Sequence, residues 1–73
     1  MTQISIVTPT FNEEQNIEIL CSEIKREMNK LNIEYEHIVI DNSSTDKTIS
    51  ILKEISLKDK NLKVIINSKN YGH

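Results

Sequence analysis

The chain has 73 residues, of which 37% are hydrophobic and 27% charged, and its formal net charge at pH 7 is −2. This length allows one small domain or a piece of a larger one, and it excludes a second domain. The charges form no like-signed run long enough to act as a nucleic-acid-binding or acidic tail, so we expect no nucleic-acid partner.

A single cysteine, Cys21, excludes an intramolecular disulfide and a cysteine metal cluster. No apolar run approaches the roughly 20 residues that a bilayer-spanning helix needs. The first ten residues also lack the basic segment and apolar core of a signal peptide. These features together predict a cytosolic, cytoplasmic chain.

The first predicted strand is the β-branched run at residues 3–8, which Pro9 should end because proline cannot donate a ladder hydrogen bond. Asn12 then stands where its side chain could accept from the free amides of a first helical turn, with Gln15 in the capping-box position. Apolar residues recur after it at spacings of three and four, which predicts a helix from Asn12 to about Leu31. The apolar stripe consists of Ile17, Leu20, Cys21, Ile24, Met28 and Leu31.

Residues 35–40 end as a continuous apolar run, which predicts a buried second strand with the polar stretch DNSSTDKT behind it. Any of Ser44, Thr45 and Asp46 could cap a second helix that reaches Leu57. The face that this helix should bury consists of Thr48, Ile51, Leu52 and Ile55.

Residues 62–66 predict a third strand, which completes a βαβαβ pattern typical of a parallel α/β sheet. Two right-handed crossovers would order the strands three, two, one and place both helices on one face. The other face would then be bare, although parallel sheets are normally covered on both sides. We therefore interpret the chain as a fragment of a larger domain, and we expect its bare face and unpaired edge to favour self-association.

The carboxyl ends of the predicted strands carry TPTFNEE, DNSSTD and NSKNYGH, and open α/β sheets bind their ligands at that edge. The only glycine, Gly72, excludes the GxGxxG and P-loop phosphate cradles. Glu13 and Glu14 put negative charge at a helix start, so we expect a ligand to present an uncharged part such as a nucleoside. Phe11 offers a ring for base stacking, and Asp41 offers a carboxylate for a base imide or a ribose hydroxyl.

The stretches IVTPTFNEEQNI, IVIDNSSTDKT and NYGH resemble the opening of the inverting glycosyltransferase family two, whose members typically begin VxPxYNExxxI and follow with VDDxSxDxT. The similarity covers essentially the whole chain. It implies the Rossmann-like N-terminal part of a GT-A fold that binds a nucleoside-diphosphate sugar. The donor-nucleotide-binding residues that it implies are Pro9, Thr10, Phe11, Asn12, Glu13, Asp41 and Asn42.

Three positions depart from the family pattern. Phe11 stands where tyrosine is usual, which keeps the ring and loses the hydroxyl. Asn42 stands where a second aspartate is common, so the position loses a charge but keeps an acceptor oxygen. Ser43 occupies a position that is often glycine.

The resemblance also implies features that lie beyond this chain. Family members bind a divalent metal, Mg²⁺ or Mn²⁺, through a DxD motif after a fourth strand, and the catalytic base lies further on. We therefore expect no catalytic residue and no metal site in this chain, and no sugar transfer by it alone. The ending NYGH resembles the polyprenyl-phosphate group, which includes dolichol-phosphate mannosyltransferases, and implies a lipid-phosphate acceptor at the inner face of the membrane for the full-length protein.

Two other functions remain open. A receiver-like signalling module needs an acidic pair straight after strand one and a phospho-accepting aspartate after strand three, where this chain has TPTF and Asn67. A non-catalytic remnant would keep the fold and lack the downstream DxD motif. Asp46 is better explained as a helix cap than as a ligand, and residues 69–71 could be either functional or a solvated loop.

Overall fold

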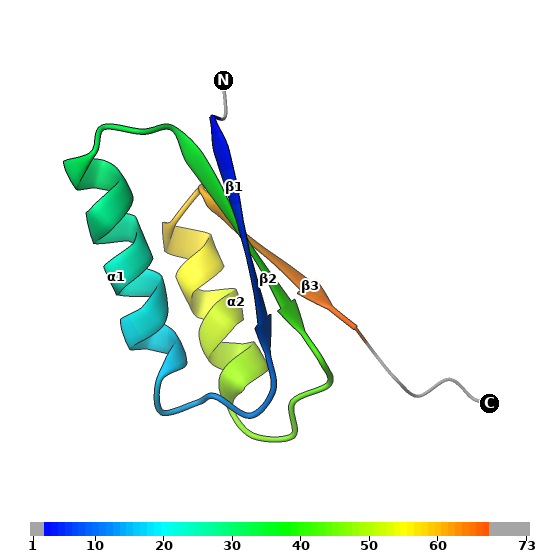
Figure 1. Ribbon diagram of the computed structural model, residues 1–73. Helices are drawn as coiled ribbons and strands as arrows, with labels where there is room; N and C mark the ends of the chain where they lie inside the picture. Colours follow the sequence, from blue (N-terminus) through cyan, green and yellow to red (C-terminus); the bar gives the residue numbers. More distant parts are fainter. Residues whose placement is uncertain (1–2, 68–73) are drawn as a thin grey trace.

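The computed structural model describes residues 3–67 and contains a parallel three-stranded sheet with two helices. In chain order the elements are β1 (Ile4–Thr10), α1 (Ile17–Lys30), β2 (Tyr35–Asp41), α2 (Thr48–Lys58) and β3 (Leu62–Ile66). The strand order β1-β2-β3 is the predicted order three, two, one read from the opposite edge (Figure 1). The α/β fold class is confirmed, and it is consistent with the N-terminal part of a GT-A domain.

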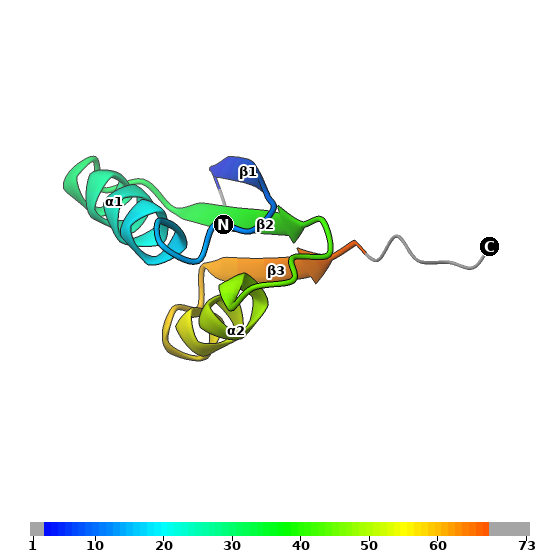
Figure 2. The same ribbon diagram turned by 90° about the horizontal axis from the view of Figure 1, so that it is seen from below.

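Both helices pack on one side of the sheet. α1 contacts α2 and α2 lies along β3, as the view from below shows (Figure 2). The buried core consists of Ile17, Cys21, Val39, Leu52 and Leu62, which come from both helices and from β2 and β3. The two predicted apolar stripes therefore supply the helical part of the core, because helical spacings of three and four turn these side chains to one face. Leu31, the last residue of the first predicted stripe, is exposed.

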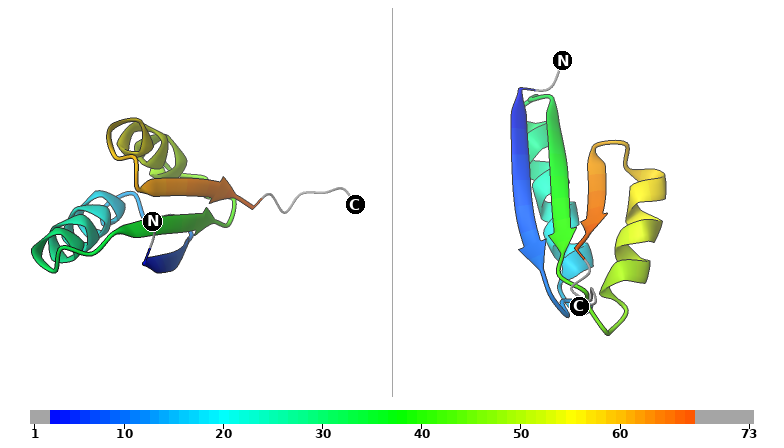
Figure 3. Two further views of the ribbon diagram at one scale, coloured as in Figure 1. Left: turned by 90° about the horizontal axis from the view of Figure 1, so that it is seen from above. Right: turned by 90° about the vertical axis from the view of Figure 1, so that its right-hand side faces the viewer.

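The opposite face of the sheet carries no helix among the described residues (Figure 3, right). Burial alternates along β2, where every second side chain is buried toward the helices and the others are half-buried. Val7 and Ile65 on the neighbouring strands are exposed. The bare face was predicted, and it is present; self-association through it stays a prediction.

The prediction that Pro9 ends the first strand is wrong, because β1 continues through it to Thr10. The Thr10 carbonyl accepts a hydrogen bond from the Asn42 amide, so the backbone groups of Thr10 face β2. The nitrogen of the preceding Pro9 then points to the free edge of the sheet. A proline is tolerated there because no ladder hydrogen bond is lost.

The prediction that the first helix starts at Asn12 is also wrong. α1 begins at Ile17, its N-cap is Asn16, and no side chain forms a hydrogen bond at that cap. Asn12 has a left-handed backbone with φ 52°, which turns its side chain away from the helix and toward the loop after β2. Leu31, where we expected the helix to end, is the C-cap.

The second helix starts at Thr48 with Lys47 as its N-cap, so the prediction that Ser44, Thr45 or Asp46 is the N-cap is wrong. Asp46 nevertheless accepts a hydrogen bond from the Thr48 amide through Oδ1 (2.9 Å), from the position before the N-cap. Thr48 and Leu52 are fully buried, as the predicted face requires.

Candidate functional site

Asp41, the last residue of β2, is fully buried at the carboxyl edge of the sheet. Its Oδ1 accepts from the hydroxyls of Thr10 (2.8 Å) and Ser44 (2.6 Å), and its Oδ2 accepts from the Ser44 amide (2.8 Å). A buried carboxylate is costly unless it is hydrogen-bonded, and these three donors compensate that cost. Asp41 thus ties the end of β1 to the loop after β2.

The loops after β1 and β2 exchange hydrogen bonds in both directions, and both lie at the lower end of Figure 1. Three consecutive amides of the first loop donate to side chains of the second loop and of Thr48, the first residue of α2. The pairs are Asn12 N to Ser44 Oγ (2.8 Å), Glu13 N to Thr48 Oγ1 (2.8 Å) and Glu14 N to Asp46 Oδ2 (3.2 Å).

Three consecutive amides of the second loop donate in return to side chains of the first. Thr45 N donates to Asn12 Oδ1 at 2.8 Å, and Asp46 N reaches the same oxygen at 3.4 Å. Lys47 N donates to Glu14 Oε1 at 2.9 Å. Each loop therefore satisfies backbone donors of the other that would otherwise need water or a ligand.

Asp46 is the one acid of the second loop, residues 42–47. Burial alone would raise the pKa of its carboxyl, but hydrogen bonds from the Thr48 hydroxyl and from the Thr48 and Glu14 amides outweigh it, and the net pKa is lowered. The carboxylate therefore stays ionised at neutral pH, where it accepts from both loops.

The amides that precede α1 are occupied by these contacts, which bears on the ligand. These three amides, of Asn12, Glu13 and Glu14, precede α1, which begins at Ile17, and they donate to protein side chains, so they are not free to bind a phosphate. This arrangement fits the expectation that the edge receives an uncharged part of a ligand.

Two of the predicted site residues directly follow the ends of β1 and β2. Phe11 follows β1 directly and is 55% exposed, although it is aromatic. Asn42 follows β2, is half-buried, and accepts a hydrogen bond from Asn67 Nδ2 at 3.1 Å. Because Thr10 and Asp41 are register partners, Phe11 and Asp41 lie at the same edge, as predicted.

The other predicted residues have supporting positions. Thr10 is buried against Asp41, Pro9 is exposed on the edge strand, Glu13 is half-buried, and the side chain of Asn12 is engaged by the second loop. Residues 69–71, for which function was left open, lie outside the described residues.

Sequence reasoning missed the parts played by Ser44, Thr48 and Asn67. The hydroxyls of Ser44 and Thr48 accept hydrogen bonds from amides of the first loop, and the Asn67 carbonyl accepts one from the Ser43 hydroxyl (2.8 Å). One signal was available: Ser43 stands where glycine is frequent, and its φ of 62° lies in the left-handed region that glycine favours.

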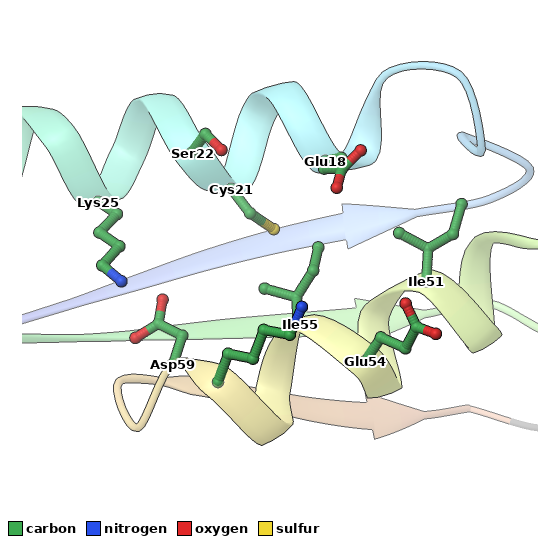
Figure 4. A pocket seen from close by; sticks show the side chains of 9 residues that line it. Glu18, Cys21, Ser22, Lys25, Ile51, Glu54, Ile55 and Asp59 are labelled. Atoms are coloured by element: carbon green, nitrogen blue, oxygen red, sulfur yellow. The ribbon is translucent and has the colours of Figure 1, made fainter.

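A cavity of about 180 Å³ lies elsewhere, between α1 and α2, and Figure 4 shows the side chains that line it. Cys21 lines it beside Ile51 and Ile55, with charged side chains such as Lys25 and Asp59 around them. Burial, and then the charge of Asp59, raises the pKa of the Cys21 thiol to about 11. The thiol is therefore protonated and unreactive at neutral pH.

Within residues 3–67 no three side chains of His, Cys, Asp or Glu converge in a way that could hold a metal ion. These residues therefore do not fit a divalent metal by themselves. In the same part of the chain no helix has the length and apolar content to cross a membrane.

The chain matches the sequence model of glycosyl transferase family 2 over residues 5–73. It is 39% identical over 71 residues to an uncharacterized glycosyltransferase of Bacillus subtilis, covering 97% of this chain and 22% of that protein. It is 39% identical over 70 residues to a dolichol-phosphate mannosyltransferase of Pyrococcus furiosus, covering 96% of this chain and 19% of the relative.

A third relative is an undecaprenyl-phosphate 4-deoxy-4-formamido-L-arabinose transferase of Proteus mirabilis, 32% identical over 73 residues, covering 99% of this chain and 22% of the relative. The chain thus spans about a fifth of the length of these curated relatives. The family match covers nearly all of the chain, including both interlocked loops, and the chain therefore belongs to glycosyl transferase family 2.

Proposed function

We propose that this chain is the N-terminal, donor-binding portion of a glycosyltransferase, and that its carboxyl-edge loops bind the nucleoside of a nucleoside-diphosphate sugar. The observation that carries the proposal is the pair Phe11 and Asn42. Phe11 is exposed and Asn42 is half-buried, and each begins a loop whose other polar groups are largely engaged with those of the other loop. The proposed donor site comprises Pro9, Thr10, Phe11, Asn12, Glu13, Asp41 and Asn42.

The chemistry of these two side chains suits a nucleoside. The exposed ring of Phe11 can stack on a base, which alanine-substitution studies value at about 1–3 kcal/mol. The NH₂ group of Asn42 can donate to a base edge, and its Oδ1, which already accepts from Asn67, has a second lone pair. Thr10 and Asp41 lie beneath these side chains and hold the strand ends together.

Residues 3–67 contain no cluster of metal ligands, so we place neither the metal nor the diphosphate that family members use on these residues. The amides before α1 are also taken by the second loop. We propose that a downstream portion of the protein binds both groups and supplies the catalytic base, so the 73-residue chain alone should transfer no sugar.

The acceptor class that we propose is a polyprenyl phosphate. The support is that two of the relatives are named for undecaprenyl-phosphate and dolichol-phosphate transfer. Such an acceptor would place the longer protein at the cytoplasmic face of a membrane. A longer protein containing this chain should label undecaprenyl phosphate from a nucleotide sugar, and labelling of only water-soluble acceptors would contradict this part.

The donor-site proposal is tested by calorimetric titration of the folded 73-residue chain with UDP, GDP, CDP and ADP. We expect one of them to bind, and Phe11→Ala to weaken that binding about tenfold, the equivalent of one stacking contact. Ile19→Ala is the matched control, because Ile19 is similarly exposed (59%) but lies on α1. No binding by the unmutated chain, or equal losses in both variants, would contradict the proposal.

A further inference from the structure

Asn12 has a conformation that serves the second loop. Its φ of 52° is uncommon for a residue with a side chain, and asparagine is among the residues that tolerate it. In this conformation Oδ1 accepts from the Thr45 amide at 2.8 Å and lies 3.4 Å from both the Thr45 hydroxyl and the Asp46 amide. The acceptor oxygen of Asn12 is therefore used within the protein.

The backbone of Asn12 is connected to the buried carboxylate by a short chain of hydrogen bonds. The Asn12 amide donates to Ser44 Oγ, the Ser44 hydroxyl donates to Asp41 Oδ1, and the Thr10 hydroxyl donates to the same oxygen. Asn12 thus holds Ser44 through its backbone and Thr45 through its side chain.

These contacts lie next to both side chains that we assign to the nucleoside. Phe11 directly precedes Asn12, and Asn42 is two residues before Ser44. The strand pairing of β1 with β2 ends at Thr10 and Asp41. One further backbone bond, from the Asn42 amide to the Thr10 carbonyl (2.9 Å), holds the start of the second loop. Beyond that bond, the position of Phe11 beside Asn42 depends on the contacts of the next residue, Asn12, with the second loop.

We propose that Asn12 is a positioning residue: through Thr45 and Asp46 it holds Phe11 and Asn42 at the separation that a nucleoside needs. This inference rests on the proposed donor site and refines the part that Asn12 plays in it. Asn12 acts through the second loop, while Phe11 and Asn42 contact the ligand.

The chain contains a matched control for this inference. Asn32 has nearly the same backbone, with φ 55°, and lies between α1 and β2 at the other end of the sheet. Within the described part of the chain, the side chain of Asn32 does not accept hydrogen bonds from another loop as that of Asn12 does. Glycine at either position keeps the left-handed backbone and removes the side chain.

The experiment compares Asn12→Gly, Asn32→Gly and Asn12→Asp by titration with the nucleoside diphosphate that the unmutated chain binds. All are measured where unfolding curves show each variant to be fully folded. We expect Asn12→Gly to weaken binding about five- to tenfold, as the loss of one or two hydrogen bonds predicts, and Asn32→Gly to leave it unchanged. Asn12→Asp keeps the acceptor oxygen and should restore most of the affinity.

Amide hydrogen exchange gives a second measurement that global stability alone would not change. In Asn12→Gly the Thr45 amide should exchange faster than in Asn32→Gly at equal stability. Equal nucleotide affinity of Asn12→Gly and Asn32→Gly would overturn the inference while leaving the donor site intact. Absence of binding by the unmutated chain would remove the donor site and this inference together.

Discussion

The buried polar side chains at the two ends of β2 differ in their hydrogen bonding. At the carboxyl end, Asp41 is fully buried and its carboxylate accepts three hydrogen bonds. At the amino end, Tyr35 is 5% exposed, and its hydroxyl forms no hydrogen bond of good geometry within residues 3–67. Burial raises the pKa of this hydroxyl, and the neighbouring Asn61 side chain opposes that shift in part. Between them, the His37 ring nitrogen Nε2 pairs with the Thr8 hydroxyl at 2.9 Å.

This difference shows which end of the sheet is organised by polar contacts. The carboxyl end joins two loops that the sheet itself does not pair, and a network with every member satisfied gives such an end one defined arrangement. At the amino end, Tyr35 is buried and contributes mainly apolar surface, and the hydrogen bonds of the described residues there are mostly backbone bonds beside the strand starts, such as that from Gln3 to Glu34. Substitutions along β2 should therefore have very unequal effects.

The largest effect is expected at Asp41. Asp41→Ala would leave the Thr10 hydroxyl and both donors of Ser44 without their acceptor, and we expect the free energy of unfolding to fall by about 3 kcal/mol. Denaturant titration measures this loss. Nucleotide affinity should fall as well, because the loops that carry Phe11 and Asn42 lose the contacts by which Asp41 holds them together.

Asp41→Asn provides the milder test should the alanine variant not fold. It keeps one acceptor oxygen but presents an NH₂ group to the Ser44 amide, so the loss of stability should be smaller. A stability change within about 0.5 kcal/mol for Asp41→Ala would place it among ordinary surface substitutions and refute the contrast between the two ends.

An intermediate effect is expected at His37, through pH. Burial lowers the pKa of His37 from its ordinary value of 6.5, and the charge of Asp59 opposes this only in part. The unfolded chain then binds a proton that the folded chain resists, so stability is retained above pH 6.5 and falls as the pH drops below it. Unfolding curves between pH 7.5 and 5 should show this fall.

His37→Gln should remove most of the pH dependence in that range. Glu36 and Asp46, whose carboxyl pKa values are lowered, lose their contribution only in more acidic solution, below their ordinary values of 4.5 and 3.8. A slope that persists in His37→Gln would assign the titration to another group.

Much of this architecture is predictable from sequence because it rests on local signals. The apolar spacing within each helix identifies the buried faces, which carry Ile17 and Cys21 on α1 and Leu52 on α2. Alternating runs of strand and helix imply a parallel sheet with one covered face. The start of α1 was mispredicted because Asn12 has two possible sets of partners. A capping signal cannot distinguish amides in its own helix from amides in another loop.

The position of the candidate site was predictable from the sequence, but the hydrogen bonds within it were not. The motif residues were placed correctly at one edge, but the bonds that join them link positions 31 to 35 residues apart in the chain. The burial of Asp41 was also not predicted, because an acid at a strand end is typical of a group that faces a ligand. Only the folded arrangement shows its carboxylate satisfied by Thr10 and Ser44.

The smallest effect is expected at the amino end of β2. Tyr35→Phe removes a buried hydroxyl that lacks a hydrogen-bond partner in the described structure and keeps the ring that packs there. Burial of an unpaired polar group is unfavourable, so we expect stability to stay the same or rise by up to about 1 kcal/mol. Denaturant titration beside Asp41→Ala measures both ends of the strand under one condition. A loss above about 1 kcal/mol in Tyr35→Phe would mean that the hydroxyl has a partner in solution, and the amino end would then depend on polar contacts as the carboxyl end does.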